Sequence, residues 1–280
     1  MIMLPFIKKI LKITLLLSAA AAFFSCAGSA SAAHETAYRM IYFSHIVPLF
    51  QNVPESKPRM DFKFCLLEAS GRPKDIAFIN TNLYQGKSPI QYRDAVIKEW
   101  QERYLGIREL ASQHPNLMIL NWEYLETMDY YMLKDRGMII GRKKYTYSGG
   151  AHGMEKTQYF VFDLADHRVL KYDNLFREGT EERLHDIVIS ELRHYNNSNG
   201  PKKLEEKQPL SQGIFFDDKP CMTDNFFINN EGLGLNWALY EIAPYSAGTI
   251  EIIIPWRTIR PLLQHETMEL LEKFGIYMFM

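Results

Sequence analysis

Residues 143–163, KKYTYSGGAHGMEKTQYFVFD, place a glycine-rich connection between two strand-like segments. Both segments are rich in aromatic and β-branched residues, which favour the half-buried surface of a β-sheet. Gly149, Gly150 and Gly153 can supply a positive φ or a bulge without steric cost. The segment therefore predicts a β-hairpin, which commits the chain to a fold built around antiparallel sheet.

Further strand-like runs lie on both sides of this hairpin, and helical segments stand between the runs. Strands are predicted at 38–47, 60–69, 76–83, 117–134, 138–147, 156–164, 169–172, 213–216, 225–229, 234–240 and 249–254. Helices are predicted at 88–114, 180–195 and 265–274. This order predicts an α+β fold, in which antiparallel β-sheets made of hairpin meanders pack with a few helices.

The segment 88–114 has the clearest helical signal. Ser88 and Gln91 form a capping box, and Pro89 occupies the first helical position. Apolar residues then recur at spacings of three and four, at Val96, Trp100, Tyr104, Ile107 and Ala111. Such spacing predicts a helix with a single apolar stripe.

The length of 280 residues fits one large domain or two small ones. We predict two subdomains, an N-terminal α+β subdomain at 38–144 and a C-terminal α+β subdomain at 145–280. The formal net charge is −1. A nucleic-acid partner would require a clustered basic face, so none is predicted.

Residues 1–26 are predicted to be a signal peptide. Lys8, Lys9 and Lys12 provide a positive start, and the apolar segment 13–24 follows. This segment is shorter than the roughly 20 residues of a membrane-spanning helix, and its length is typical of a secretory signal.

Two cleavage positions remain open. Cys26 follows a small residue directly after the apolar segment, as in a bacterial lipobox, whereas Ala30-Ser31-Ala32 fits ordinary signal peptidase. In the first case acyl chains such as palmitate on Cys26 anchor the protein to a membrane, and 27–37 form a flexible tether. The predicted location is the bacterial cell envelope, either periplasmic or attached to the outer membrane.

Cys65 and Cys221 are the cysteines that follow Cys26. Export permits a disulfide between them. Cys65 lies in a strand-like run, where a buried thiol serves equally well as a small hydrophobic side chain. The sequence leaves both possibilities open.

The turn around His152 supports two interpretations. In the structural one, it is an ordinary connection and His152 faces solvent or bonds to the backbone. In the functional one, the glycines let a ligand or partner approach the backbone, and His152 supplies a polar contact. No second ligand lies at metal-binding spacing from His152, so no metal or other cofactor is predicted.

A second turn, around Tyr240-Glu241-Ile242-Ala243-Pro244-Tyr245, follows a predicted strand. Its tyrosines can pack or donate hydrogen bonds near the turn. If the protein binds a ligand or partner, the predicted contact residues are Tyr147, Gly149, Gly150, His152, Tyr240 and Tyr245.

Sequence patterns of known catalytic sites are missing. The chain has no G-x-S-x-G and no C-x-x-C, and the segment from His265 lacks the second histidine of H-E-x-x-H. No catalytic residue is predicted. A hydrolase would become the better interpretation if His152 lay beside Asp163, Asp173 or Glu241 in a pocket.

Two segments together resemble a known family. YSGGAHG, with QYFVFDLADHRVLKYDNLF after it, and FFINNEGLGLNWALYEIAPYSAGTIEIIIPW are similar to the two halves of domain of unknown function 3298. The resemblance covers 145–262 well and 38–144 loosely. Such domains form the outer part of lysozyme-sensing anti-sigma factors and accessory parts of peptidoglycan deacetylases.

This chain departs from both kinds of protein, since it has neither a sigma-binding segment before the apolar stretch nor a deacetylase domain. The resemblance therefore implies an exported, lipid-anchored envelope protein with a non-catalytic binding or sensing role. Its expected partners are lysozyme-like proteins or peptidoglycan. The alternatives are a hydrolase acting on cell-wall glycan or peptide, and a purely structural envelope protein.

Overall fold

The computed structural model describes residues 35–50, 58–114 and 118–277, which belong to one compact unit. The predicted signal peptide, Cys26, both cleavage positions and most of the tether lie outside the described residues. Within the described ranges, none of the helices has the length and apolar character needed to cross a membrane.

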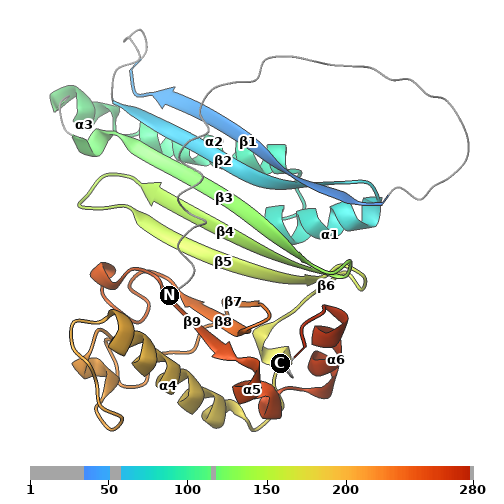
Figure 1. Cartoon of the computed structure of the whole chain (residues 1–280). Helices are drawn as coiled ribbons and strands as arrows, with labels where there is room; N and C mark the ends of the chain where they lie inside the picture. Colours follow the sequence, from blue (N-terminus) through green and yellow to red (C-terminus); the bar gives the residue numbers. More distant parts are fainter. Residues whose placement is uncertain (1–34, 51–57, 115–117, 278–280) are drawn as a thin grey trace, which may run out of the picture. The chain divides into compact units, whose positions relative to one another are not determined.

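A six-stranded sheet forms the N-terminal part of this unit (Figure 1). Its strands follow chain order: β1 (Ala37–Pro48), β2 (Arg59–Ser70), β3 (Trp122–Leu133), β4 (Gly137–Tyr147), β5 (Met154–Asp163) and β6 (Arg168–Val169). All neighbours are antiparallel except β2 and β3, which run parallel. The predicted α+β class is confirmed, and the parallel pair is the departure from the expected antiparallel sheets.

Three helices connect the parallel pair: α1 (Pro73–Tyr84), α2 (Pro89–Leu105) and α3 (Arg108–Gln113). Parallel neighbours cannot be joined by a tight turn, so the chain must cross over between them. The predicted capping box is confirmed, because Ser88 Oγ accepts from the backbone N–H of Gln91 and Gln91 Oε1 accepts from that of Ser88. The single helix predicted at 88–114 is divided after Leu105.

Two predicted strands are wrong. The segment 76–83 lies within α1, where Ile79 and Leu83 are buried one helical turn apart. A short apolar run has no periodicity that separates strand from helix. The segment 213–216 is a turn, in which the backbone N–H of Ile214 donates to the side chain of Asn196 and that of Phe216 donates to Ile242.

One hydrophobic core lies between the six-stranded sheet and its helices. Aromatic rings are prominent in it: Phe62 and Phe64 of β2 pack against Tyr124 of β3, and Tyr124 packs against Trp100 of α2. Aromatic side chains bury large areas, so this core accounts for much of the aromatic content of the chain.

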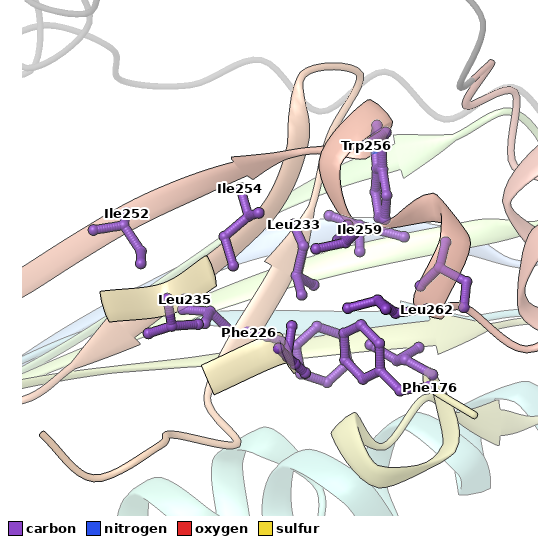
Figure 2. Packing of buried hydrophobic residues seen from close by; sticks show 14 of the residues in the cluster. Phe176, Phe226, Leu233, Leu235, Ile252, Ile254, Trp256, Ile259 and Leu262 are labelled. Atoms are coloured by element: carbon purple, nitrogen blue, oxygen red, sulfur yellow. The ribbon is translucent and has the colours of Figure 1, made fainter. Parts of the chain in front are cut away.

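The C-terminal part contains a three-stranded antiparallel sheet and three helices. These elements are α4 (Glu181–Asn199), β7 (Phe226–Ile228), β8 (Gly232–Trp237), β9 (Ile250–Pro255), α5 (Trp256–Ile259) and α6 (His265–Lys273). Their apolar residues form a second core (Figure 2). Trp237 and Trp256 are buried in it, and their indole N–H groups donate to backbone carbonyls.

Asn225 joins the two parts. Its side-chain amide donates to the carbonyl of Thr157 and accepts from the N–H of Tyr159, both on β5. The predicted boundary between residues 144 and 145 falls inside β4, which pairs with β5 along its length. The division into two subdomains at that position stays a prediction.

Both described cysteines are free thiols. Cys65 is half-buried in β2 and its Sγ lies 3.7 Å from the carbonyl oxygen of Met128, whereas Cys221 is exposed. The half-buried thiol matches the interpretation of Cys65 as a small side chain of a sheet.

Candidate binding site

The turn between β4 and β5 has the glycine conformations that the sequence predicts. Gly149 and Gly150 adopt φ values of 90° and 107°, which only glycine takes readily. The hydroxyl of Tyr147 donates to the carbonyl of Gly150 at 3.0 Å and closes the loop. Gly149 and Gly150 therefore shape the connection, and His152 follows on the return to β5.

Gly153 has a different role, which is to make room. A Cβ atom at this position would lie 2.4 Å from the ring of Tyr145. Only glycine lets the backbone pass so close to that ring.

The second predicted turn follows β8. Tyr240 takes a φ of 65°, and the carboxylate of Glu241 accepts from the backbone N–H of Ala238 at 2.7 Å. Pro244 then leads into a 3-10 turn, Tyr245–Ala247. The tight reversal at Tyr240 brings the rings of Tyr240 and Tyr245 close together.

The two turns meet at His152. Its imidazole stacks on Tyr245 with 3.6 Å between ring centroids and 17° between planes. Nε2 of His152 lies 3.1 Å from the hydroxyl of Tyr240, and Nδ1 lies 3.3 Å from the carbonyl of Gly153. A neutral imidazole with its proton on Nδ1 satisfies both contacts, donating to Gly153 and accepting from Tyr240. We call His152, Tyr240 and Tyr245 the histidine–tyrosine cluster.

This cluster is open to solvent. His152 is exposed and Tyr240 is 47% exposed, while Tyr245 is half-buried beneath the imidazole. Tyr145, which the sequence analysis missed, lies close by. Burial raises the pKa of Tyr145, and the charges of Glu123 and Tyr245 raise it further. The alternation of Tyr145 with Tyr147 on one face of β4 was the signal that could have identified it.

The six predicted contact residues thus fall in two groups. His152, Tyr240 and Tyr245 touch one another, whereas Tyr147, Gly149 and Gly150 form the turn that presents His152. Whether any of them binds a ligand or partner stays a prediction.

The surroundings of His152 do not form an acid–base pair. Its contacts among the described residues are Gly153, Tyr240 and Tyr245. Asp163 stands at the far end of β5, paired with Arg136 at 2.8 Å, and Glu241 bonds to its own turn. In the described part of the chain, no group of three or more His, Cys, Asp or Glu could hold a metal ion. The arrangement can stack and donate hydrogen bonds, which suits binding.

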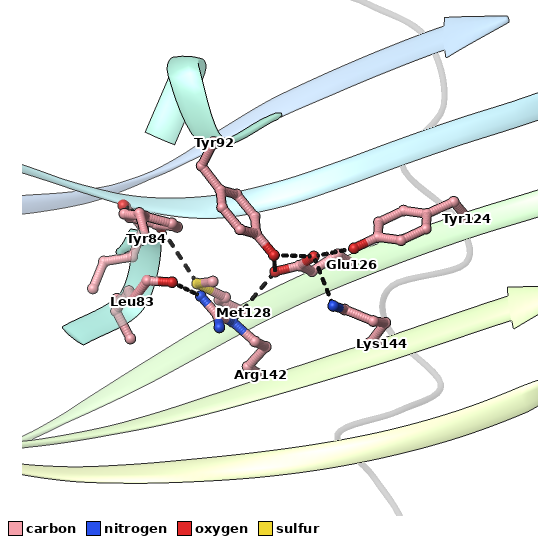
Figure 3. Close-up of polar contacts among 9 residues, drawn as sticks. Leu83, Tyr84, Tyr92, Tyr124, Glu126, Met128, Arg142 and Lys144 are labelled. Atoms are coloured by element: carbon pink, nitrogen blue, oxygen red, sulfur yellow. Dashed lines mark hydrogen bonds and ion pairs between the residues drawn. The ribbon is translucent and has the colours of Figure 1, made fainter. Parts of the chain in front are cut away.

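A second polar group, which the sequence analysis missed, is buried on β3. The carboxylate of Glu126 is fully buried and accepts from the hydroxyls of Tyr124 at 2.6 Å and Tyr92 at 2.9 Å (Figure 3). Nε of Arg142 lies 3.3 Å and Nζ of Lys144 lies 3.8 Å from this carboxylate. Tyr92 belongs to α2, so the group joins that helix to β3 and β4.

Burial dominates the titration of the tyrosines in this group. Burial, with the charge of Glu126 as the next cause, raises the pKa of Tyr92 to about 12. It also raises the pKa of Tyr124 far above its usual value, again with Glu126 as the next cause. Both hydroxyls therefore stay protonated and donate to the carboxylate.

Residues 173–257 match the family model described as "Protein of unknown function (DUF3298)". The chain carries a DUF3298 domain. This confirms the family resemblance, over a shorter stretch than the predicted 145–262. Among curated proteins, none matches the sequence.

Two solved structures of DUF3298 proteins are similar to this chain. A family member from Bacteroides fragilis NCTC 9343 has a TM-score of 0.71 and 20% sequence identity, covering 87% of this chain and 97% of the other. One from Pseudomonas aeruginosa PAO1 has a TM-score of 0.55 and 16% identity, covering 84% and 97%. At these identities the likeness shows a common fold.

The DUF3298 match includes Tyr240 and Tyr245 and excludes His152. The histidine–tyrosine cluster is therefore built by the DUF3298 domain together with the hairpin that precedes it.

Proposed function

We propose that this protein is exported to the bacterial envelope, held at a membrane by lipid on Cys26, and binds an envelope partner without acting on it chemically. The proposed partners are peptidoglycan and lysozyme-like proteins. The main support for a binding role is the histidine–tyrosine cluster. In it, two turns from different parts of the chain present stacked rings at the surface. Tyrosine is enriched among residues that dominate binding energy, because its ring buries a large area and its hydroxyl finds a partner.

Export and lipidation are supported by the sequence of residues 1–26. They are tested by labelling cells with a palmitate analogue. The protein should incorporate label and Cys26→Ser should not. Cleavage after Ala32, determined by mass spectrometry of the mature N-terminus, would contradict the lipid anchor.

Binding is tested with the purified protein, by co-sedimentation with peptidoglycan sacculi and by surface binding to lysozyme. His152→Ala and Tyr245→Ala should weaken saturable binding at least tenfold. Tyr131→Ala is the matched control, because Tyr131 is a 66% exposed tyrosine on β3. Binding that all three variants retain would place the site elsewhere. If the protein bound neither sacculi nor lysozyme, the proposal that these are its partners would be contradicted.

A hydrolase acting on cell-wall glycan or peptide is the alternative. It requires an acid or base beside His152, and the contacts of His152 give it no support. Release of soluble fragments from sacculi, lost in His152→Ala, would reverse this preference.

A further inference from the structure

A groove of about 730 Å³ lies along β1, on a different part of the fold from the histidine–tyrosine cluster. Its lining comes from four consecutive residues of β1, Tyr42 to His45, and from one face of α2 between Arg93 and Leu105. Ligand sites in proteins have volumes of roughly 300–1,000 Å³, so the space is large enough for a specific ligand.

The lining residues place the groove at the edge of the sheet. Successive residues of a strand point to opposite faces, so a surface shared by the consecutive residues from Tyr42 to His45 has to be the edge of β1. β1 pairs with β2 along its whole length, from Ala37–Ser70 to Pro48–Arg59. In the sheet order β1 is the terminal strand, and within the described residues no strand pairs with its other side.

An open strand edge has a defined chemistry. In an antiparallel pair, alternate residues direct both N–H and C=O away from the partner strand. The free edge of β1 therefore presents donors and acceptors in alternation, and another extended backbone can pair with them.

The α2 wall adds side-chain recognition. Phe43 and Ile97 are half-buried and supply apolar surface, and the guanidinium of Arg93 lies 4.3 Å from the ring centroid of Phe43 while pairing with Asp94 at 2.6 Å. Lys98 and Glu102 are exposed along the rim. From Arg93 to Leu105 the helix spans about 18 Å, the length of about five residues of extended chain.

We propose that this groove binds an extended peptide segment of a partner protein, which adds to the sheet as a strand beside β1. Backbone hydrogen bonds to β1 supply affinity, and every second peptide side chain contacts Phe43, Ile97 and Leu105. This inference is independent of the proposed function.

Other occupants fit the groove less well. A helical ligand has already paired its own backbone groups and cannot use the edge of β1. A second copy pairing through its own β1 would bring a second α2 to the same side of the sheet, where the first α2 already walls the groove. The space beside β1 accommodates a single strand.

The test begins with a displayed library of random ten-residue peptides selected on the purified protein. We expect selected sequences with apolar residues at alternate positions. Methylating the backbone nitrogens of a selected peptide one by one should weaken binding at every second position, because only those N–H groups face β1. Apolar anchors three and four residues apart, or the absence of any selected peptide, would overturn the proposal.

Two tryptophan variants locate the site. Gln101→Trp fills the groove and should weaken peptide binding at least tenfold. Glu99→Trp is the control on the same helix, because Glu99 does not line the groove and its side chain is 57% exposed. Circular dichroism checks that both variants fold. Equal binding by both variants would overturn the proposal. A dimer in sedimentation that Gln101→Trp dissociates would assign the edge to a second copy and also overturn it.

Discussion

His152 and Tyr245 stack ring on ring with 3.6 Å between their centroids, although the first belongs to the β4–β5 hairpin and the second to the DUF3298 domain. The stack therefore joins the two parts of the compact unit at the surface. Its energy should be measurable as a coupling between these two positions.

Tyr245→Leu should lower the free energy of unfolding by about 0.5–1.5 kcal/mol, the usual range for a pair of stacked rings. His152→Ala should cost little more once Tyr245 is already leucine, because residues in contact do not contribute additively. Urea titrations of the two single variants and the double variant measure the coupling. Additive losses would show that the stack contributes nothing.

Gly153→Ala should destabilise the protein by about 1–3 kcal/mol, because the new methyl group has to displace the ring of Tyr145. Thermal unfolding measures the loss. Combining Gly153→Ala with Tyr145→Ala gives the methyl group room, so the double variant should lose less than the sum of the single losses. An unchanged melting temperature for Gly153→Ala would contradict the close approach.

Glu126→Gln should lower the free energy of unfolding by about 3–5 kcal/mol, because it leaves the charge of Arg142 buried without its carboxylate. Glu99→Gln is the matched control. It breaks an exposed pair with Arg103, and such pairs contribute about 0–1 kcal/mol. Urea titrations compare the two. Equal, small losses would show that Glu126 does not hold α2 to the sheet.

The predictions that were confirmed rest on local sequence patterns. The capping box at Ser88 and the glycine turn at Gly149–Gly150 depend on neighbours a few residues apart, so the sequence displays them directly. Such features need no knowledge of how distant segments meet.

Most of the features that were not predicted depend on contacts between residues far apart in the sequence. Glu126 looks like an ordinary polar residue on the solvent side of a strand, and its burial depends on hydroxyls from Tyr92 and Tyr124 and cations from β4. The parallel register of β2 and β3 likewise depends on a crossover of three helices. The meeting of His152 with Tyr245 was not predicted, although both residues were singled out separately.

Lowering the pH should reveal the contribution of Asp75 to the free energy of unfolding. Asp75 is buried at the start of α1. Burial raises the pKa of Asp75, but hydrogen bonds from Thr36, His167 and Arg72 lower it by more, so the pKa lies below its ordinary value. A carboxyl with a lowered pKa in the folded state stabilises the protein above its unfolded pKa of about 3.9. This stabilisation is lost as the pH falls through the folded pKa.

Asp75→Asn should therefore cost about 2 kcal/mol at pH 7, the scale of hydrogen bonds to a charged group. Its unfolding free energy should also fall less steeply than that of the unsubstituted protein below pH 4. Urea titrations from pH 2 to 7 measure both effects. Asp94→Asn, at a side chain that is 60% exposed, is the control. Parallel pH profiles for the protein and Asp75→Asn would contradict the assignment.

The two described thiols should react at different rates. Burial raises the pKa of Cys65, which lowers the fraction of reactive thiolate, whereas Cys221 is exposed. Iodoacetamide at pH 8 should modify Cys221 at least tenfold faster, as followed by peptide mass spectrometry. The rates should converge in concentrated urea. Equal rates in the native protein would show that Cys65 is accessible.

The parallel pairing of β2 with β3 has a kinetic consequence. The β1–β2 and β3–β4–β5 ladders join strands that are adjacent in sequence and can form early, whereas β2 and β3 can meet only after the intervening chain has been closed into a loop. Closing a long loop costs entropy before any contact rewards it, and such contacts slow folding. We therefore expect the pairing of β2 with β3 to be the slow step of refolding.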